Sequence, residues 1–197
     1  MPRRSFPAPH RLDLRATLGP LSTGRGDPAH RLAPAEAWRA TRTPQGPASL
    51  HLRVHDGRVE AQAWGPGAEW ALDGTPALVG AGDAPEQLDT DHPVVRRLQH
   101  HHPGLRLCRS AAVLEILVPT ILAQKVTGLE ARRAWHRLVR RYGEPAPGPS
   151  GLRVPPSAAT LAGIPYYDLH GLGIERRRAD TVRRVCARAA RVEEVVD

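Results

Sequence analysis

The segment whose residue types and spacing most clearly suit a binding function is Gln124-Lys125-Val126-Thr127-Gly128. It lies between two helical patterns. Lys125 is the only lysine among 28 lysine and arginine residues. Thr127 and Glu130 have the spacing of a capping box, in which the hydroxyl and the carboxylate each bind a free amide at a helix start. Two interpretations of this turn are open. Lys125 stabilises the end of the preceding helix by about 0.3 to 1 kcal/mol, or amides near Thr127 bind a phosphate while Gln124 or Lys125 reaches a nucleic acid duplex.

Other residues that could carry out chemistry form less specific patterns. The run His100-His101-His102 has no carboxylate at ligand spacing, and Cys108 and Cys186 belong to no CxxC pair or cluster. We therefore expect no metal site and no cofactor. Trp38 is a lone tryptophan among alanines, a setting that suits a core.

Composition restricts the class of protein. The chain has 197 residues, of which 41% are hydrophobic, and this is enough for a sizeable core. Its formal charge of +8 and its pI near 10.8 favour a polyanionic partner. No apolar run of 18 residues occurs, so we expect no membrane association and a cytoplasmic, nucleoid-associated protein.

Residues 1–90 are expected to form a small α/β domain. Apolar residues alternate with polar ones on both sides of Asp56-Gly57, which favours a type I′ turn, so residues 49–64 predict a β-hairpin. Residues 12–18 suggest a further strand, and residues 33–42 suggest a short helix with Trp38 on one side.

Residues 91–197 have a helical period. Ser110 is a plausible N-cap for the helix at 113–122, in which Pro119 either introduces a kink or marks the true start. The helix opened by Thr127 should end at Gly143, residues 144–156 have the composition of a loop, and Ser157 should cap a short helix ending near Gly163. The last helix should begin near Glu175 and continue to about residue 192. The residues expected to point inward are Leu114, Leu117, Val118, Ile121, Leu122, Leu129, Trp135, Leu138, Val139, Tyr142, Ala179, Val182, Val185, Ala189 and Val192. In the helix that begins after Thr127, the arginines and His136 should point mostly outward. The predicted class is α+β, with a β-containing domain followed by a mostly helical one.

Residues 92–192 also resemble the first half of the helix-hairpin-helix DNA glycosylase domain, in the 3-methyladenine DNA glycosylase II branch. The resemblance is carried by "ILAQKVT", by an arginine-bearing helix closing on "YG", by "RVPPS", and by "LGIERRRA". It implies that residues 124–128 face DNA and that Trp38 is a candidate wall of the base pocket. In that family the residue after the turn glutamine fills the space left by an extruded base; it is often apolar, whereas this chain has Lys125.

The resemblance further implies a monomer that binds double-stranded DNA with alkylated bases and hydrolyses the N-glycosidic bond of those bases. In the family, the DNA-binding hairpin, the aromatic base pocket and the catalytic aspartate follow the helix at 175–192. The expectation is therefore a truncated chain that lacks the catalytic aspartate and is inactive alone, with no catalytic residue to nominate. The alternative is a non-catalytic basic DNA-binding protein.

Overall fold

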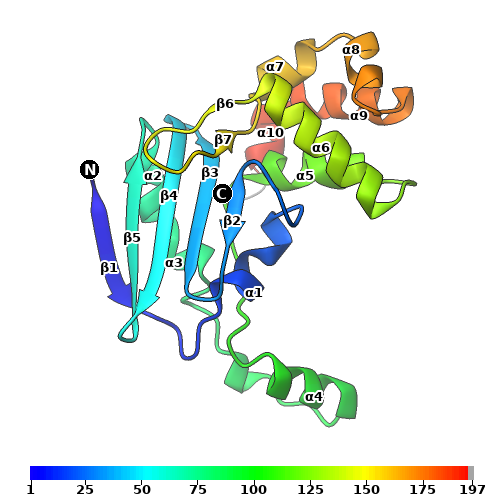
Figure 1. Ribbon diagram of the computed structural model, residues 1–197. Helices are drawn as coiled ribbons and strands as arrows, with labels where there is room; N and C mark the ends of the chain where they lie inside the picture. Colours follow the sequence, from blue (N-terminus) through cyan, green and yellow to red (C-terminus); the bar gives the residue numbers. More distant parts are fainter. Residues whose placement is uncertain (195–197) are drawn as a thin grey trace.

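The computed structural model describes residues 1–194 and has the expected α+β fold. A five-stranded antiparallel sheet is covered by helices on one face, and a second group of helices lies beside it (Figure 1). The strands are β1 (Arg3–Pro7), β2 (His30–Leu32), β3 (Glu36–Thr43), β4 (Gly46–His55), β5 (Arg58–Trp64), β6 (Glu144–Pro145) and β7 (Arg153–Val154). The helices are α1 (Leu14–Leu18), α2 (Ala68–Asp73), α3 (Thr75–Leu78), α4 (Pro93–His101), α5 (Val113–Leu122), α6 (Gly128–Tyr142), α7 (Ala158–Gly163), α8 (Tyr166–Gly171), α9 (Arg176–Cys186) and α10 (Ala189–Glu193), with short 3-10 turns at Gly19–Leu21 and Pro85–Gln87.

The predicted β-hairpin is confirmed as β4 and β5. The two strands pair antiparallel up to His55 and Arg58, on either side of the two-residue turn. Asp56 and Gly57 have φ values of 49° and 69°, and positive φ at both positions is what a type I′ turn requires. In the complete sheet the strand order is β1-β5-β4-β3-β2.

Two predictions for the N-terminal part were wrong. Residues 14–18 form helix α1, because the Asp13 carboxylate caps it by accepting a hydrogen bond from the Ala16 amide at 2.9 Å. Residues 36–43 form the inner strand β3, which pairs with β4 on one side and with the edge strand β2 on the other. These strand pairings override the helix preference of its alanines.

One hydrophobic core lies between the sheet and helices α1 to α3. Leu50, Leu52 and Val59 point from the hairpin into this core, and each is at most 1% exposed. Leu14, Leu18 and Leu72 meet them from the helices. Among residues 1–194, no helix covers the opposite face of the sheet, which is called the helix-free face below (Figure 1).

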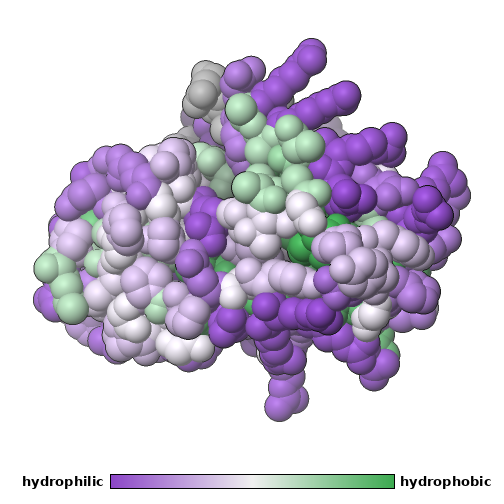
Figure 2. Space-filling model, turned by 90° about the horizontal axis from the view of Figure 1, so that it is seen from above, coloured by the Kyte–Doolittle hydropathy of each residue, from purple (hydrophilic) through white to green (hydrophobic). Residues whose placement is uncertain are grey.

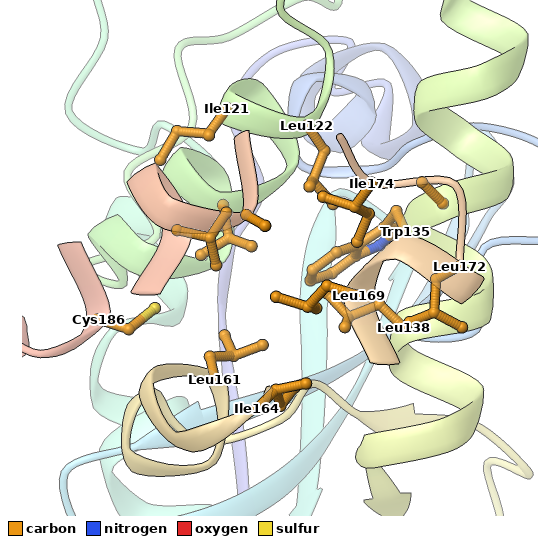
Figure 3. Close-up of a cluster of buried hydrophobic side chains, with 14 of the residues drawn as sticks. Ile121, Leu122, Trp135, Leu138, Leu161, Ile164, Leu169, Leu172, Ile174 and Cys186 are labelled. Atoms are coloured by element: carbon orange, nitrogen blue, oxygen red, sulfur yellow. The ribbon is translucent and has the colours of Figure 1, made fainter. Parts of the chain in front are cut away.

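A second core holds the helices of the C-terminal part together. Trp135 and Leu138 of α6 pack against Leu122 of α5, Leu169 of α8 and Ile174, which precedes α9, and Figure 3 shows these side chains pointing toward one another. The two cores consist of residues 12–79 and 118–186, with Cys108 packed against the first. The domain division at residue 90 stays a prediction.

Several local predictions for the helices are confirmed. Gly143 is the C-cap of α6, Ser157 caps α7 by accepting from the Thr160 amide at 3.0 Å, and Glu175 precedes α9. Pro119 lies inside α5 and does not mark its start. Residues 144–156 contain the short pair β6–β7, which packs on the sheet.

Four details of the helical prediction were wrong. Ser110 is not the N-cap of α5; Ala112 holds that position, and the free amides are capped by a carboxylate far along the chain. Leu129 is 46% exposed, because it lies at the exposed N-terminus of α6 and not over the core. His136, expected on the outer face, is buried. The last helix breaks after Cys186, so α10 is a separate turn.

Candidate nucleic-acid interface

The turn between α5 and α6 is exposed and held by a complete capping box. The Thr127 hydroxyl accepts from the Glu130 amide at 3.3 Å, and the Glu130 carboxylate accepts from the Thr127 amide at 3.0 Å. These bonds hold the pKa of Glu130 below its usual value. The Ala131 amide donates to the Thr127 carbonyl, which leaves the amides of Gly128 and Leu129 at the tip of a 15-residue helix. Such amides and the helix dipole together form an anion-binding position.

Lys125 adopts a backbone conformation that its side chain disfavours. Its φ is +58°, in the left-handed region, which costs an L-residue roughly 1 to 2 kcal/mol. This left-handed residue changes the direction of the chain between α5 and α6. Gln124 and Lys125 are exposed, and Val126 is half-buried. The cation and the free amides of Gly128 and Leu129 therefore sit three to four residues apart on one exposed turn.

Arg178 anchors this turn from below, and sequence reasoning missed it. Arg178 is 8% exposed; its Nη1 donates to the Leu122 carbonyl at 2.8 Å and its Nη2 lies 3.5 Å from the Gly173 carbonyl. Leu122 ends α5, so a cation here binds a carbonyl at the negative end of the helix dipole. The available signal was the spacing of Arg178, Val182 and Cys186, which share one buried face of α9.

Two carboxylates fix helix α5 in place, one by bonds to the sheet part and one by bonds from α10. The Glu115 carboxylate of α5 accepts from Arg39 at 2.8 Å, from the Thr41 hydroxyl at 2.6 Å and from the Arg42 amide at 2.7 Å. At the start of α5, the Glu193 carboxylate accepts from the amides of residues 113 and 114 at 2.7 and 3.0 Å. These long-range bonds hold the orientation of the helix that ends in the turn.

His136 of α6 makes a further contact with the sheet part. Its Nε2 lies 3.1 Å from the Thr23 hydroxyl, which in turn donates to Asp27 at 2.9 Å. Burial lowers the pKa of His136, and the nearby Asp27 only partly opposes this shift. Burial of Asp27 itself disfavours its charge, but His30 and the amides of Thr23 and Ala29 outweigh that effect and hold its pKa well below the usual range.

Exposed arginine side chains lie along α6 and α9 in the helical half of the molecule. The exposed ones on α6 and α9 are Arg133, Arg137, Arg140, Arg141, Arg176, Arg177 and Arg184. Within residues 1–194, ion pairs neutralise Arg141, through Asp168, and Arg176, through Asp180. Figure 2 shows hydrophilic side chains projecting from this half. The surface is therefore an electropositive one that suits a phosphate backbone.

Trp38, the candidate base-pocket residue, lies elsewhere. It projects from β3 onto the helix-free face of the sheet, where its ring stacks on His51 at 3.9 Å. The turn at residues 124–128 is at the end of α6 that points away from the sheet (Figure 1). The structure thus brings residues 124–128 together and leaves Trp38 apart from them.

Carboxylates on the helices near the turn are engaged or exposed. Glu130 is in the capping box, Asp168 and Asp180 are in ion pairs, and Glu175 is exposed at the start of α9. Across the described part of the chain, no three His, Cys, Asp or Glu side chains gather as a metal site would require. His100, His101 and His102 are all exposed, and both cysteines are free thiols. No helix within residues 1–194 has the length and apolar character needed to cross a membrane.

The chain matches no protein-family model and no curated protein. Its fold, however, is shared by solved DNA glycosylases. A 3-methyladenine DNA glycosylase from Archaeoglobus fulgidus superposes over 93% of this chain and 66% of its own, with a TM-score of 0.75 and 15% identity. MBOgg1 in complex with a low-affinity DNA ligand gives a TM-score of 0.71 at 12% identity, over 95% of this chain and 62% of its own.

A third structure with this fold is the Clostridium acetobutylicum 8-oxoguanine glycosylase/lyase bound to double-stranded DNA with cytosine opposite 8-oxoG. Its TM-score is 0.66 at 12% identity, over 92% of this chain and 60% of its own. The chain thus has the fold of DNA glycosylases and spans 60% to 66% of the length of these three proteins.

Proposed function

We propose that this chain is the DNA-binding portion of a DNA N-glycosylase that acts on alkylated bases, as in the 3-methyladenine branch. The observation that carries the proposal is the exposed turn at residues 124–128. It combines Lys125, whose backbone is strained, with the two free helix amides of Gly128 and Leu129, and the buried Arg178 holds the end of the preceding helix. The glycosylase fold supports this function over that of a non-catalytic basic DNA-binding protein.

In the proposed reaction, the damaged nucleotide leaves the duplex and its base is released by hydrolysis. The amides of Gly128 and Leu129 bind a backbone phosphate beside the lesion. The methylene stem of Lys125 fills part of the space left by the extruded base, while its ammonium group binds a phosphate. Alkylation gives the base a positive charge, so it departs without needing a strong general acid.

The charge that develops on the sugar needs a carboxylate in a water-excluded position. Within residues 1–194, the carboxylates near the turn are engaged in a cap or ion pairs, or are exposed. We therefore propose that the chain contributes DNA binding and lesion exposure, and that it does not cleave the bond alone. This division of roles makes separate predictions for binding and for chemistry.

The test combines a binding assay with a base-release assay. Binding of a fluorescent duplex containing an abasic-site analogue is measured by anisotropy at several salt concentrations. Lys125→Ala should weaken binding and reduce the salt slope by about 0.9, because one phosphate contact is lost. Arg97→Ala on α4 is the matched control, since it removes one exposed positive charge far from the turn and should leave affinity unchanged.

In the second assay, the chain is incubated with methylated DNA and free 3-methyladenine is measured by chromatography. We expect release no higher than from DNA alone. Equal weakening by Lys125→Ala and Arg97→Ala would contradict the role of the turn. Base release above the DNA-only control would contradict the proposed division of roles.

A further inference from the structure

The helix-free face of the sheet carries a cleft that is separate from the turn at residues 124–128. Its volume is about 630 Å³, and the side chains that matter for its chemistry are Arg3, Trp38, His51, Arg53, Gln62 and Trp64. They come from four adjacent strands, β1, β5, β4 and β3. With a strand spacing of about 4.8 Å, the cleft extends about 14 Å across the sheet.

Aromatic rings form one wall of this cleft. Trp38 stacks on His51 at 3.9 Å with an interplanar angle of 12°, and its ring lies 5.5 Å from that of Trp64 with an angle of 19°. The chain has four tryptophans, so half of them lie on a sheet face that belongs to neither core. This placement gives the solvent side of the sheet a set of nearly parallel π-systems.

The loop before β7 covers one end of the rings and leaves the other end accessible. Trp64 is 8% exposed, since Gly148 of that loop lies against it; a Cβ at Gly148 would come within 2.5 Å of the indole. The Trp64 indole N–H donates to the sulfur of Met1 at 3.0 Å. Trp38 is only half-buried, and its exposed partner Arg31 lies 5.5 Å from the ring in a cation–π contact. Such an exposed contact is weaker than the stacking of a nucleobase on tryptophan, so a base can displace Arg31.

Cations predominate around the rings. Arg3 is exposed and, among residues 1–194, has no carboxylate partner, whereas Arg53 is 62% exposed in its side chain and lies 3.6 Å from Glu36. Glu36 also binds His51 at 2.7 Å, so its charge is already engaged. Glu60 is the remaining carboxylate of the cleft. A ligand for this face should therefore combine negative charge with flat rings.

We propose that this face of the sheet binds single-stranded nucleic acid across β1, β5, β4 and β3. Bases stack against the Trp38 end of the aromatic wall, and Arg3 and Arg53 bind phosphates. A duplex is disfavoured because its bases keep their ring faces inside the helical stack. A mononucleotide would use only part of the 14 Å span. The proposal does not depend on the glycosylase assignment, because it uses another surface.

The test compares fluorescent oligo(dT) and a duplex of equal length by anisotropy with the full chain. Arg3→Ala together with Arg53→Ala should weaken oligo(dT) binding by about tenfold and reduce its salt slope by about 1.4, at roughly 0.7 per phosphate contact. Trp38→Leu should weaken it by roughly 5- to 160-fold, whereas Trp38→Phe should retain most of the affinity. Circular dichroism checks that each variant is folded. If Trp38→Leu does not fold, the arginine double variant still tests the proposal, because both arginines are exposed.

Lys125→Ala separates this site from the turn. It should weaken duplex binding and leave oligo(dT) binding unchanged, and the sheet variants should do the reverse. If both sets of variants weaken both forms of DNA equally, one common surface binds DNA and the proposal is wrong. Competition by dTMP as effective as that by oligo(dT), per mole, would also overturn it.

Discussion

The buried pair Arg39–Glu115 should be the strongest single link between the sheet and helix α5. The two side chains are 5% and 13% exposed, and their Nη2 and Oε2 atoms are 2.8 Å apart. Removing one partner of a buried pair leaves the other charge without compensation, at a cost of about 3 to 5 kcal/mol. Glu115→Gln keeps the shape and an acceptor for Thr41, so we expect a loss of about 3 kcal/mol in the free energy of unfolding.

The companion change is Arg39→Met, which leaves Glu115 with two remaining donors. We expect this variant to lose about 2 kcal/mol, because those donors still stabilise the carboxylate. The double variant contains neither charge, so its loss should be smaller than the sum of the two by about 2 kcal/mol. Urea denaturation of all four proteins, followed by circular dichroism, gives this coupling energy. Additive losses would refute the claim that the pair acts as a unit.

Two further predictions concern buried groups of the helical part. Arg178→Met removes the donor to the Leu122 carbonyl, so it should lower the free energy of unfolding by about 2 kcal/mol and also weaken duplex binding. Urea denaturation measures the first effect and anisotropy the second. Arg178→Lys should recover part of both. For His136, burial puts the folded-state pKa below the unfolded value, so its stabilising contribution is present above the unfolded pKa and is lost as the pH falls through the folded pKa. Unfolding measured from pH 7.5 to 5 should show a steeper loss for the wild type than for His136→Gln, and parallel curves would contradict this.

Local signals in the sequence predicted the elements whose geometry is set locally. Asp56-Gly57 determines its turn through two positive φ angles, and Thr127 with Glu130 closes a capping box within one helical turn. The two wrong predictions, a strand at residues 12–18 and a helix at residues 33–42, had a different cause. Both segments are short, and the strand pairing of β3 depends on partners that its own residues do not specify.

The supports of the candidate site were not predictable from local patterns. Glu115 and Glu193 act through contacts with residues more than 70 positions away, and Arg178 binds a carbonyl 56 positions upstream. In sequence, Arg178 and His136 resemble the solvated residues of arginine-rich helices. Only the packing of α9 against α5, and of α6 against the loop at Thr23, makes them buried.

The most direct test of the central claim is a titration of the ¹⁵N-labelled chain with duplex DNA, followed by NMR of the backbone amides. We expect the amide signals of Gly128 and Leu129 to shift on binding, because they donate to a phosphate, while that of Gly57 in the hairpin turn stays in place. Binding of the duplex with unchanged signals at Gly128 and Leu129 would contradict the assignment of the turn as the DNA-facing surface.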